Sequence, residues 1–264
     1  MAGLQNASLE ALRARIERLE NRPAFAEGLN LKTARPEDLL AAPAGILEEI
    51  YSDDRRNSAA ALGFALGQAQ QLFSPQRPAL IILGLMHEAQ DAGVPYGAGL
   101  AHFGVDPDAV VIGRVETIVE LLWALEEAVA CRAVAAVIAD VAGCPKALDF
   151  TASRRISMRA VAAGTSVFML RYGREREASA AHLRWRLDPE PSIAPAFDDR
   201  APGAPRLKAI LEKGRSAREA IELVVEWTDH GFVVVDRSGA RDAAGAAPSG
   251  AVPAALGYRL SQAG

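Results

Sequence analysis

The stretch ALIILGLM, residues 79–86, is a nearly unbroken apolar run of strand length. Two similar runs follow along the chain: VAAVIAD at residues 134–140 and SVFML at residues 166–170. Runs of this kind are typical of strands that are covered on both faces, as in parallel sheets. The three runs therefore predict the centre of a parallel sheet.

The segments around these runs alternate between strand and helix patterns. Further strands are predicted for residues 46–51 and 109–112, and helices for residues 59–73, 115–130 and 153–163. This order predicts an α/β fold in which a doubly wound, mostly parallel sheet has helices on both faces. After Tyr172, strand patterns without intervening helices predict an antiparallel C-terminal extension of the same sheet, at residues 183–187, 206–212, 220–228 and 232–236.

The composition excludes several classes of protein. Of the 264 residues, 50% are hydrophobic and 23% are charged, which is enough for a sizeable core. A net charge of −4, from 29 basic and 33 acidic side chains, argues against a protein that is basic all over and coats nucleic acid. The two cysteines form no disulfide framework, and no apolar run reaches the roughly 18 residues that a membrane span needs. We therefore expect a cytoplasmic protein that does not span a membrane.

The two ends of the chain are expected to lie outside the core. Residues 1–22 carry Leu9, Leu12, Ile16 and Leu19 at helical spacing, which predicts an amphipathic N-terminal interaction helix. Because such a short helix is marginal in water, it should dock either on its own domain or on a partner. Composition then predicts a linker, a core and a flexible tail over residues 23–44, 45–236 and 237–264.

The turn after the first predicted strand is where an open α/β sheet first offers a ligand site. A phosphate-binding loop needs glycines, a lysine, and a serine or threonine for magnesium. This turn has no glycine and no lysine, and its two carboxylates would repel a triphosphate. It resembles a degenerate nucleotide loop, although nucleotide binding through its two arginines stays open. Its residues are Ser52, Asp53, Asp54, Arg55, Arg56, Asn57, Ser58 and Ala59.

Few other residues are candidates for catalysis or for metal binding. Asp140 ends the run at 134–140, where an acidic residue often holds a metal in nucleotide-hydrolysing folds but also often forms a turn. His87 and Glu88 follow the run at 79–86 and are either polar site residues or simply solvated. The four histidines lack metal-ligand spacing, and the sequence has neither a GxSxG nor an HExxH motif. We therefore predict no catalytic site, no metal and no cofactor.

Arginines are concentrated between residues 153 and 186 of this acidic chain. Such a cluster suits a phosphate backbone or an acidic partner, and the alternative is a solvated face with local ion pairs. The tryptophans Trp123, Trp185 and Trp227 lie in periodic segments and are predicted to belong to the core. The candidates for a partner or DNA surface are Arg154, Arg155, Arg159, Arg171, Arg174 and Arg176.

The order of these segments resembles the core of the RecA recombinase. Glu49, Ile50 and Tyr51 resemble the strand that leads into the RecA phosphate-binding loop, and GVDPD at 104–108 resembles a Gly-Val-Asp-x-Asp run of RecA. Within that superfamily the chain looks most like ImuA, the RecA-like member of bacterial SOS mutagenesis cassettes. Three segments resemble the C-terminal half of that family: LRWRLDPEPS, GAPRLKAILEKGR and VVEW, which begin at residues 183, 203 and 224. The resemblance covers about residues 45–236.

The same resemblance marks what this chain lacks. Residues 58–59 fall where RecA has its phosphate-binding Lys and metal-binding Thr, and Met86 lies near the place of its catalytic Glu. Arg171 and Tyr172 stand where RecA has an Asn and a nucleotide-sensing Gln. Asp140 alone remains, as a vestigial Walker B aspartate, and one carboxylate without a phosphate-binding loop cannot support phosphoryl transfer. The resemblance therefore implies neither ATPase activity nor strand exchange.

What the resemblance implies instead is a scaffold role in DNA repair. ImuA-type proteins are implied to act with ImuB, an inactive Y-family polymerase homologue, and with a DnaE-type polymerase in error-prone translesion synthesis. We therefore expect a non-catalytic accessory protein that contacts such a homologue, RecA or a DnaE-type polymerase, with DNA contact indirect or weak and self-association left open. The alternatives are a SulA-like cell-division inhibitor and a divergent ATP-binding RecA paralogue.

Overall fold

The computed structural model describes residues 44–195, 200–214 and 221–235, together with residues 38, 40, 41, 197 and 198. The predicted N-terminal helix with Leu9, Leu12, Ile16 and Leu19 therefore lies outside the described residues. Most of the predicted linker and the whole predicted tail also lie outside them.

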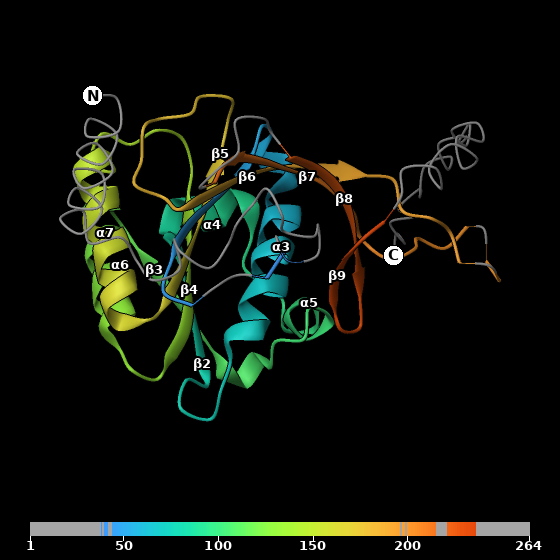
Figure 1. Cartoon of the computed structure of the whole chain (residues 1–264), viewed down its shortest axis with the longest axis horizontal. Helices are drawn as coiled ribbons and strands as arrows, with labels where there is room; N and C mark the ends of the chain where they lie inside the picture. Colours follow the sequence, from blue (N-terminus) through green and yellow to red (C-terminus); the bar gives the residue numbers. More distant parts are fainter. Residues whose placement is uncertain are drawn as a thin grey trace, which may run out of the picture.

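A mixed sheet organises the described part of the chain, with its strands in the order β3-β2-β4-β5-β1-β6-β7-β8-β9 (Figure 1). Pairing is parallel from β3 through β6 and antiparallel from β6 through β9. This confirms the α/β class and the antiparallel extension, except that β6 still runs parallel to β1. The strands are β1 (Leu47–Ser52), β2 (Ala79–Leu85), β3 (Val110–Val115), β4 (Val134–Val141), β5 (Ser166–Tyr172), β6 (Leu183–Glu190), β7 (Arg206–Lys213), β8 (Ile221–Thr228) and β9 (Gly231–Val234).

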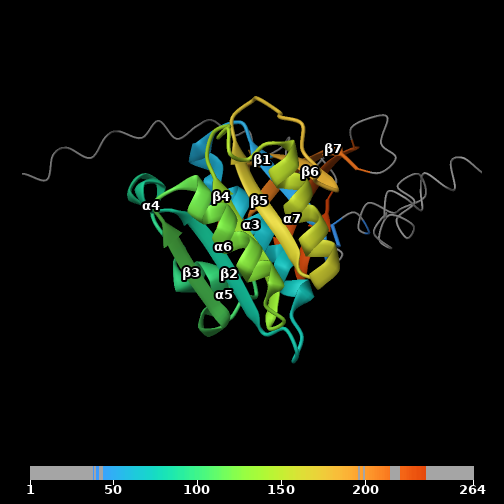
Figure 2. The same ribbon diagram turned by 90° about the vertical axis from the view of Figure 1, so that its left-hand side faces the viewer.

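Helices cover both faces of the sheet. Figure 2 shows α6 and α7 in front of the sheet, with α3 and α5 behind it. The sequence patterns did not predict α4 or α5, which follow β2. None of the helices described is long and apolar enough to cross a membrane. The helices are α3 (Ser58–Ala69), α4 (Met86–Ala92), α5 (Gly97–His102), α6 (Ile118–Ala130) and α7 (Phe150–Ala163), with 3-10 turns η2 (Arg55–Asn57), η3 (Gln70–Leu72) and η4 (Pro107–Ala109).

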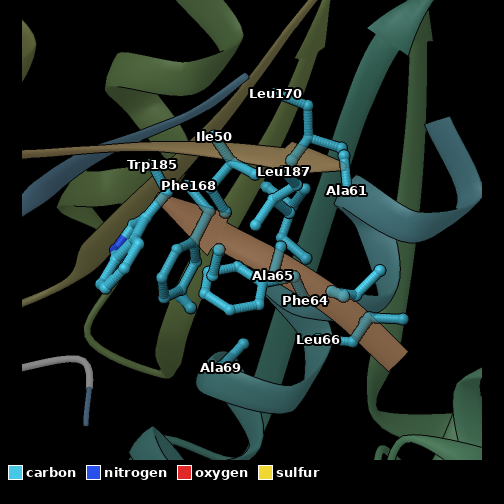
Figure 3. Packing of buried hydrophobic residues seen from close by; sticks show 14 of the residues in the cluster. Ile50, Ala61, Phe64, Ala65, Leu66, Ala69, Phe168, Leu170, Trp185 and Leu187 are labelled. Atoms are coloured by element: carbon cyan, nitrogen blue, oxygen red, sulfur yellow. The ribbon is translucent and has the colours of Figure 1, made fainter. Parts of the chain in front are cut away.

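The helix α3 is the centre of one half of the core. Phe64 packs among Phe168 of β5 and Trp185 of β6, with its ring centroid 5.8 Å from that of Trp185 (Figure 3). The opposite side of α3 is also covered, because a Cβ on Gly63 would lie only 2.5 Å from Phe103 Cζ. The small residues of α3 therefore let the sheet approach from one side and α5 from the other.

The helices α6 and α7 form the other half of the core, and both have well-defined ends. Thr117 and Glu120 form a capping box at the start of α6, with each backbone N–H donating to the other side chain at 3.1 and 3.2 Å. Asp149 caps α7 by accepting a bond of 2.7 Å from Ala152 N, and Gly164 ends it with a φ of +66°. The apolar face of α6 packs on β2 and β4, and that of α7 packs on β1 and β5.

The prediction that all three tryptophans belong to the core is wrong for one of them. Trp185 and Trp227 are buried, as predicted, but Trp123 is 67% exposed on α6. The buried stripe of α6 contains Leu121 and Leu125 at helical spacing, which turns Trp123 to the solvent side. A tryptophan in an apolar helix thus gave no information about which face it occupies.

Candidate functional site

The carboxyl ends of the parallel strands carry one row of side chains on the α3 face of the sheet. In the strand register, Gly84 of β2 lies beside Arg114 of β3, and Ser52 of β1 lies beside Tyr172 of β5. Asp140 of β4 lies between these pairs, with its Cβ 3.7 Å from where a Cβ on Gly84 would be. The row therefore occupies the edge where open α/β sheets bind ligands.

Arg114 reaches this row only because residue 84 has no side chain. A Cβ on Gly84 would clash with Arg114 Nη1. The guanidinium therefore crosses β2 above Gly84 toward Asp140. Arg114 was not predicted from the sequence, since the only signal is a glycine inside an apolar strand, which often marks a close approach of another group.

Arg55 and Glu88 complete the group, which we call the carboxyl-edge cluster: Arg55, Glu88, Arg114, Asp140 and Tyr172. Arg55 Nη2 lies 3.4 Å from Glu88 Oε2, and the Arg55 guanidinium lies over the Tyr172 ring at 5.1 Å from its centre. Glu88 is buried beside the row, whereas His87 is exposed. The cluster contains two cationic and two anionic side chains, so its formal charges balance.

The electrostatics of the cluster are governed by burial. Burial raises the pKa of Asp140 above its usual range; Arg55 opposes this effect and Glu88 adds to it. Burial and the neighbouring Asp140 raise the pKa of Tyr172. The neighbouring Tyr172 hydroxyl lowers the pKa of Asp140 and so also opposes the effect of burial. Among the described residues, neither Asp140 Oδ1 nor Tyr172 Oη has a hydrogen-bond partner.

The degenerate loop at residues 52–59 is held by its own side chains. Asp54 Oδ1 accepts a bond of 2.9 Å from Arg56 N and so caps η2, and the Asp54 carbonyl accepts from Asn57 N and from Ser52 Oγ. In a phosphate-binding loop, such N–H groups point at phosphate oxygens. Here the Asp54 carboxylate accepts from the backbone N–H of Arg56, in the position that a phosphate oxygen would occupy. Ser58 and Ala59 begin α3 and contribute no cation.

The structure corrects the prediction that Arg171 belongs to an exposed surface. Arg171 is 2% exposed at the end of β5. Its guanidinium lies 3.1 Å from Glu177 Oε2 and 4.0 Å from Glu49 Oε1, and it also donates to the Gly143 carbonyl at 3.0 Å. A buried guanidinium with two acidic neighbours is not available to DNA or to a partner.

Arg176, another residue of the predicted partner or DNA surface, is partly exposed and forms ion pairs within the molecule. Its Nη2 donates to Asp53 Oδ1 and its Nε to Glu212 Oε2, each at 2.8 Å. The guanidinium lies 4.2 Å from the centre of the buried Tyr51 ring, and Arg184 lies over the same ring at 5.4 Å. Through these contacts, the segment after β5 joins the loop after β1 to strand β7.

The remaining arginines are exposed, but they do not form one group. Arg154, Arg155 and Arg159 lie on α7, whereas Arg174 lies after β5. Arg155 and Arg159 both pair with Glu126 of α6, Arg159 at 3.2 Å. Within the described chain, Arg154 and Arg174 form no ion pair.

Both helices carry exposed side chains on the surface that they turn away from the sheet, which we call the α6–α7 face: Val119 and Trp123 of α6, and Phe150, Arg154 and Met158 of α7. The four apolar members are between 48% and 67% exposed. Phe150, Arg154 and Met158 follow one another at helical spacing along α7. A shallow hollow connects the two helices, lined by Val119, Leu122, Trp123, Glu126, Ala147 and Arg155.

Two further findings bear on the site. Within the described ranges, no group of three or more His, Cys, Asp and Glu side chains could hold a metal ion. No family model matches the chain, and no curated protein matches it. The functional assignment therefore rests on the sequence resemblance and on the residues described above.

Proposed function

We propose that this chain is a non-catalytic, RecA-like accessory protein of SOS-induced, error-prone translesion DNA synthesis in the cytoplasm. It acts through contacts with an inactive Y-family polymerase homologue of the ImuB type and, in the same assembly, with RecA or a DnaE-type polymerase. The sequence resemblance of residues 45–236 to ImuA supports this proposal. The observation that carries its non-catalytic part is the loop after β1, which Asp53 and Arg176 join to the rest of the fold.

The carboxyl-edge cluster supports the absence of phosphoryl transfer. Nucleotide-hydrolysing folds hold a metal ion beside the strand-end carboxylate and the phosphates. Here Arg55, a cation of the chain itself, lies beside Glu88 and near Asp140. A general base must be free to contact the group from which it takes a proton, and Glu88 is held in an ion pair with Arg55. The cluster therefore has neither a cradle for phosphate nor a free base.

The segment after β5 supports indirect rather than direct DNA contact. Ser179 Oγ donates to the buried Glu49 carboxylate at 2.8 Å, and Lys213 Nζ donates to the Ser179 carbonyl at 2.7 Å. Arg176 and Glu177 of the same segment are engaged in internal ion pairs. A DNA-binding loop needs free cations, and among its arginines only Arg174 meets that condition.

We assign the partner contact to the α6–α7 face. Tryptophan and arginine are the residues that most often dominate binding energy at protein interfaces, and both are exposed here as Trp123 and Arg154. The exposed apolar side chains of the same two helices favour a partner with an apolar groove, and Arg154 favours an acidic rim on that partner. The N-terminal helix remains a predicted second surface.

The test is recovery of partners from cells exposed to a DNA-damaging agent. The tagged full-length chain should co-elute with the inactive Y-family homologue, identified by mass spectrometry. Trp123→Ala and Arg154→Glu should each reduce that recovery, whereas Arg174→Glu, an exposed arginine on another surface, should not. Recovery of an FtsZ-type division protein instead would favour the SulA-like alternative. Equal recovery by all variants would overturn the assignment of the α6–α7 face.

A further inference from the structure

A cavity of about 260 Å³ lies beside the carboxyl-edge cluster, between α3, α5 and the sheet. Its size is just under the roughly 300–1,000 Å³ of pockets for drug-sized ligands, so it suits a molecule of one or two rings. The exposed side chain of Tyr96 also lines it. Its apolar walls include Leu62, Leu66, Ile82, Leu100, Phe103 and Leu170.

Three polar side chains of the carboxyl-edge cluster line the same cavity: Arg114, Asp140 and Tyr172. In each, one buried atom has no hydrogen-bond partner among the described residues: Arg114 Nε, Asp140 Oδ1 and Tyr172 Oη. The Tyr172 residue is only 6% exposed. Because buried polar groups in folded proteins are nearly always paired, side chains that lack such partners at the wall of an apolar cavity indicate a ligand.

The charges around the cavity indicate that this ligand is neutral. Arg114 and Asp140 line it directly, and Arg55 and Glu88 form an ion pair beside them. A phosphate or carboxylate would meet the Asp140 carboxylate, and an ammonium group would meet Arg114. A neutral group that offers a donor to Asp140 and an acceptor to Arg114 meets no repulsion.

We propose that this cavity binds a small, uncharged nitrogen heterocycle whose edge carries a hydrogen-bond donor beside an acceptor, as in a lactam or a carboxamide. The donor bonds the Asp140 carboxylate, the acceptor bonds the Arg114 guanidinium, and the ring lies against Phe103 and its apolar neighbours. This inference goes beyond the proposed function, since the partner contact on the α6–α7 face lies on the other side of the sheet and does not require the cavity.

The test measures binding of hypoxanthine and nicotinamide to the full-length chain by ligand-detected NMR. Both present a donor beside an acceptor, whereas indole offers a ring of similar size with a donor and no acceptor. We expect a Kd below about 1 mM for at least one of the two probes and clearly weaker binding of indole. Arg114→Met, which removes the guanidinium, should weaken probe binding by about tenfold.

Two matched variants of α5 locate the site. Gly99 lines the cavity, and a Cβ there would meet open space, so Gly99→Phe should close the cavity without straining the fold. Ala98 is equally exposed but does not line the cavity, and Ala98→Phe should leave binding unchanged. The proposal is overturned if neither probe binds, if Gly99→Phe binds them as tightly as the wild type, or if indole binds equally well. Tighter binding of inosine monophosphate than of inosine would also overturn it, because that result shows a phosphate site.

Discussion

Asp53 and Arg176, 123 residues apart in the sequence, are joined by a hydrogen bond of 2.8 Å between Oδ1 and Nη2. Glu212 of β7 binds the Nε of the same guanidinium, so Arg176 connects the loop after β1 to the antiparallel part of the sheet. The loop that resembles a nucleotide-binding loop is therefore ordered by contacts within the chain. The ion pair therefore supports the proposal that this chain has a RecA-like fold without the nucleotide hydrolysis of RecA.

The first prediction concerns nucleotide binding. ATP with magnesium at millimolar concentration should change the Tm of the full-length chain by less than about 1 °C. A ligand at 100 times its Kd adds about 2.7 kcal/mol to stability, which for a domain of this size raises the Tm by roughly 5 °C or more. Differential scanning calorimetry with and without ATP measures the effect, and RecA serves as the positive control. A shift of several degrees would show that Arg55 or Arg56 supports nucleotide binding after all.

The second prediction concerns the ion pairs of Arg176. Arg176→Met should lower the free energy of unfolding by about 1–3 kcal/mol, because Asp53 and Glu212 both lose a charged donor. Arg174→Met is the matched control, since Arg174 is exposed two residues earlier, and its effect should stay within about 0.5 kcal/mol. Urea unfolding followed by circular dichroism compares them. Equal effects would mean that Arg176 does not order this region.

The third prediction concerns pH and the buried Glu48. Burial raises the pKa of Glu48 to about 8, although Gln68 Nε2 donates to its Oε1 at 2.7 Å. In the unfolded chain the same group ionises near its ordinary value of 4.5. Between these values the unfolded state loses a proton that the folded state keeps, so stability falls as pH rises, by up to about 1.4 kcal/mol per pH unit.

Glu48→Gln removes this titration and keeps an oxygen that can accept from Gln68. The variant should therefore be more stable than the wild type at a pH of about 7.5, and the difference should shrink toward a pH of about 5. Urea midpoints at both pH values provide the comparison. Glu116→Gln, an exposed glutamate, should show no such trend. A constant difference across pH would mean that Glu48 ionises normally in the folded state.

The fold could be predicted from the sequence wherever burial alone determines the order of apolar and polar residues. The runs at 79–86 and 134–140 are apolar because both faces of the sheet are covered, and they form β2 and β4 as predicted. The short helices α4 and α5 were missed because they lie in a segment with Gly93, Pro95 and two further glycines, whose local preference is for turns. Their helical form depends on packing against the rest of the fold, which the local pattern does not contain.

The candidate site could be predicted from the sequence only in part. The unsuitability of the loop at 52–59 for phosphate follows from its composition, since no glycine or lysine is present. The grouping of the arginines was predicted less well, because Arg171 and Arg176 find acidic partners on other strands. Pairing between residues so far apart leaves no mark on local sequence. The same holds for the path of Arg114 across Gly84.

The last prediction concerns the α6–α7 face of the purified chain. Trp123→Asp should weaken binding to the ImuB-type Y-family homologue by about tenfold or more, because an interface tryptophan often contributes 2 kcal/mol or more. Ile112→Asp on the edge strand β3, which also removes an exposed apolar side chain, should not change binding. Since both side chains are exposed, the Tm of each variant should remain close to that of the wild type.

The most direct test of the account is isothermal titration calorimetry of the purified full-length chain with the inactive Y-family homologue encoded in the same cells, with neither ATP nor DNA present. The account predicts a saturable complex with the wild type and with Ile112→Asp, and a loss of affinity of at least about tenfold with Trp123→Asp. Absence of a complex with the wild-type chain, or a complex that forms only when ATP is added, would contradict it.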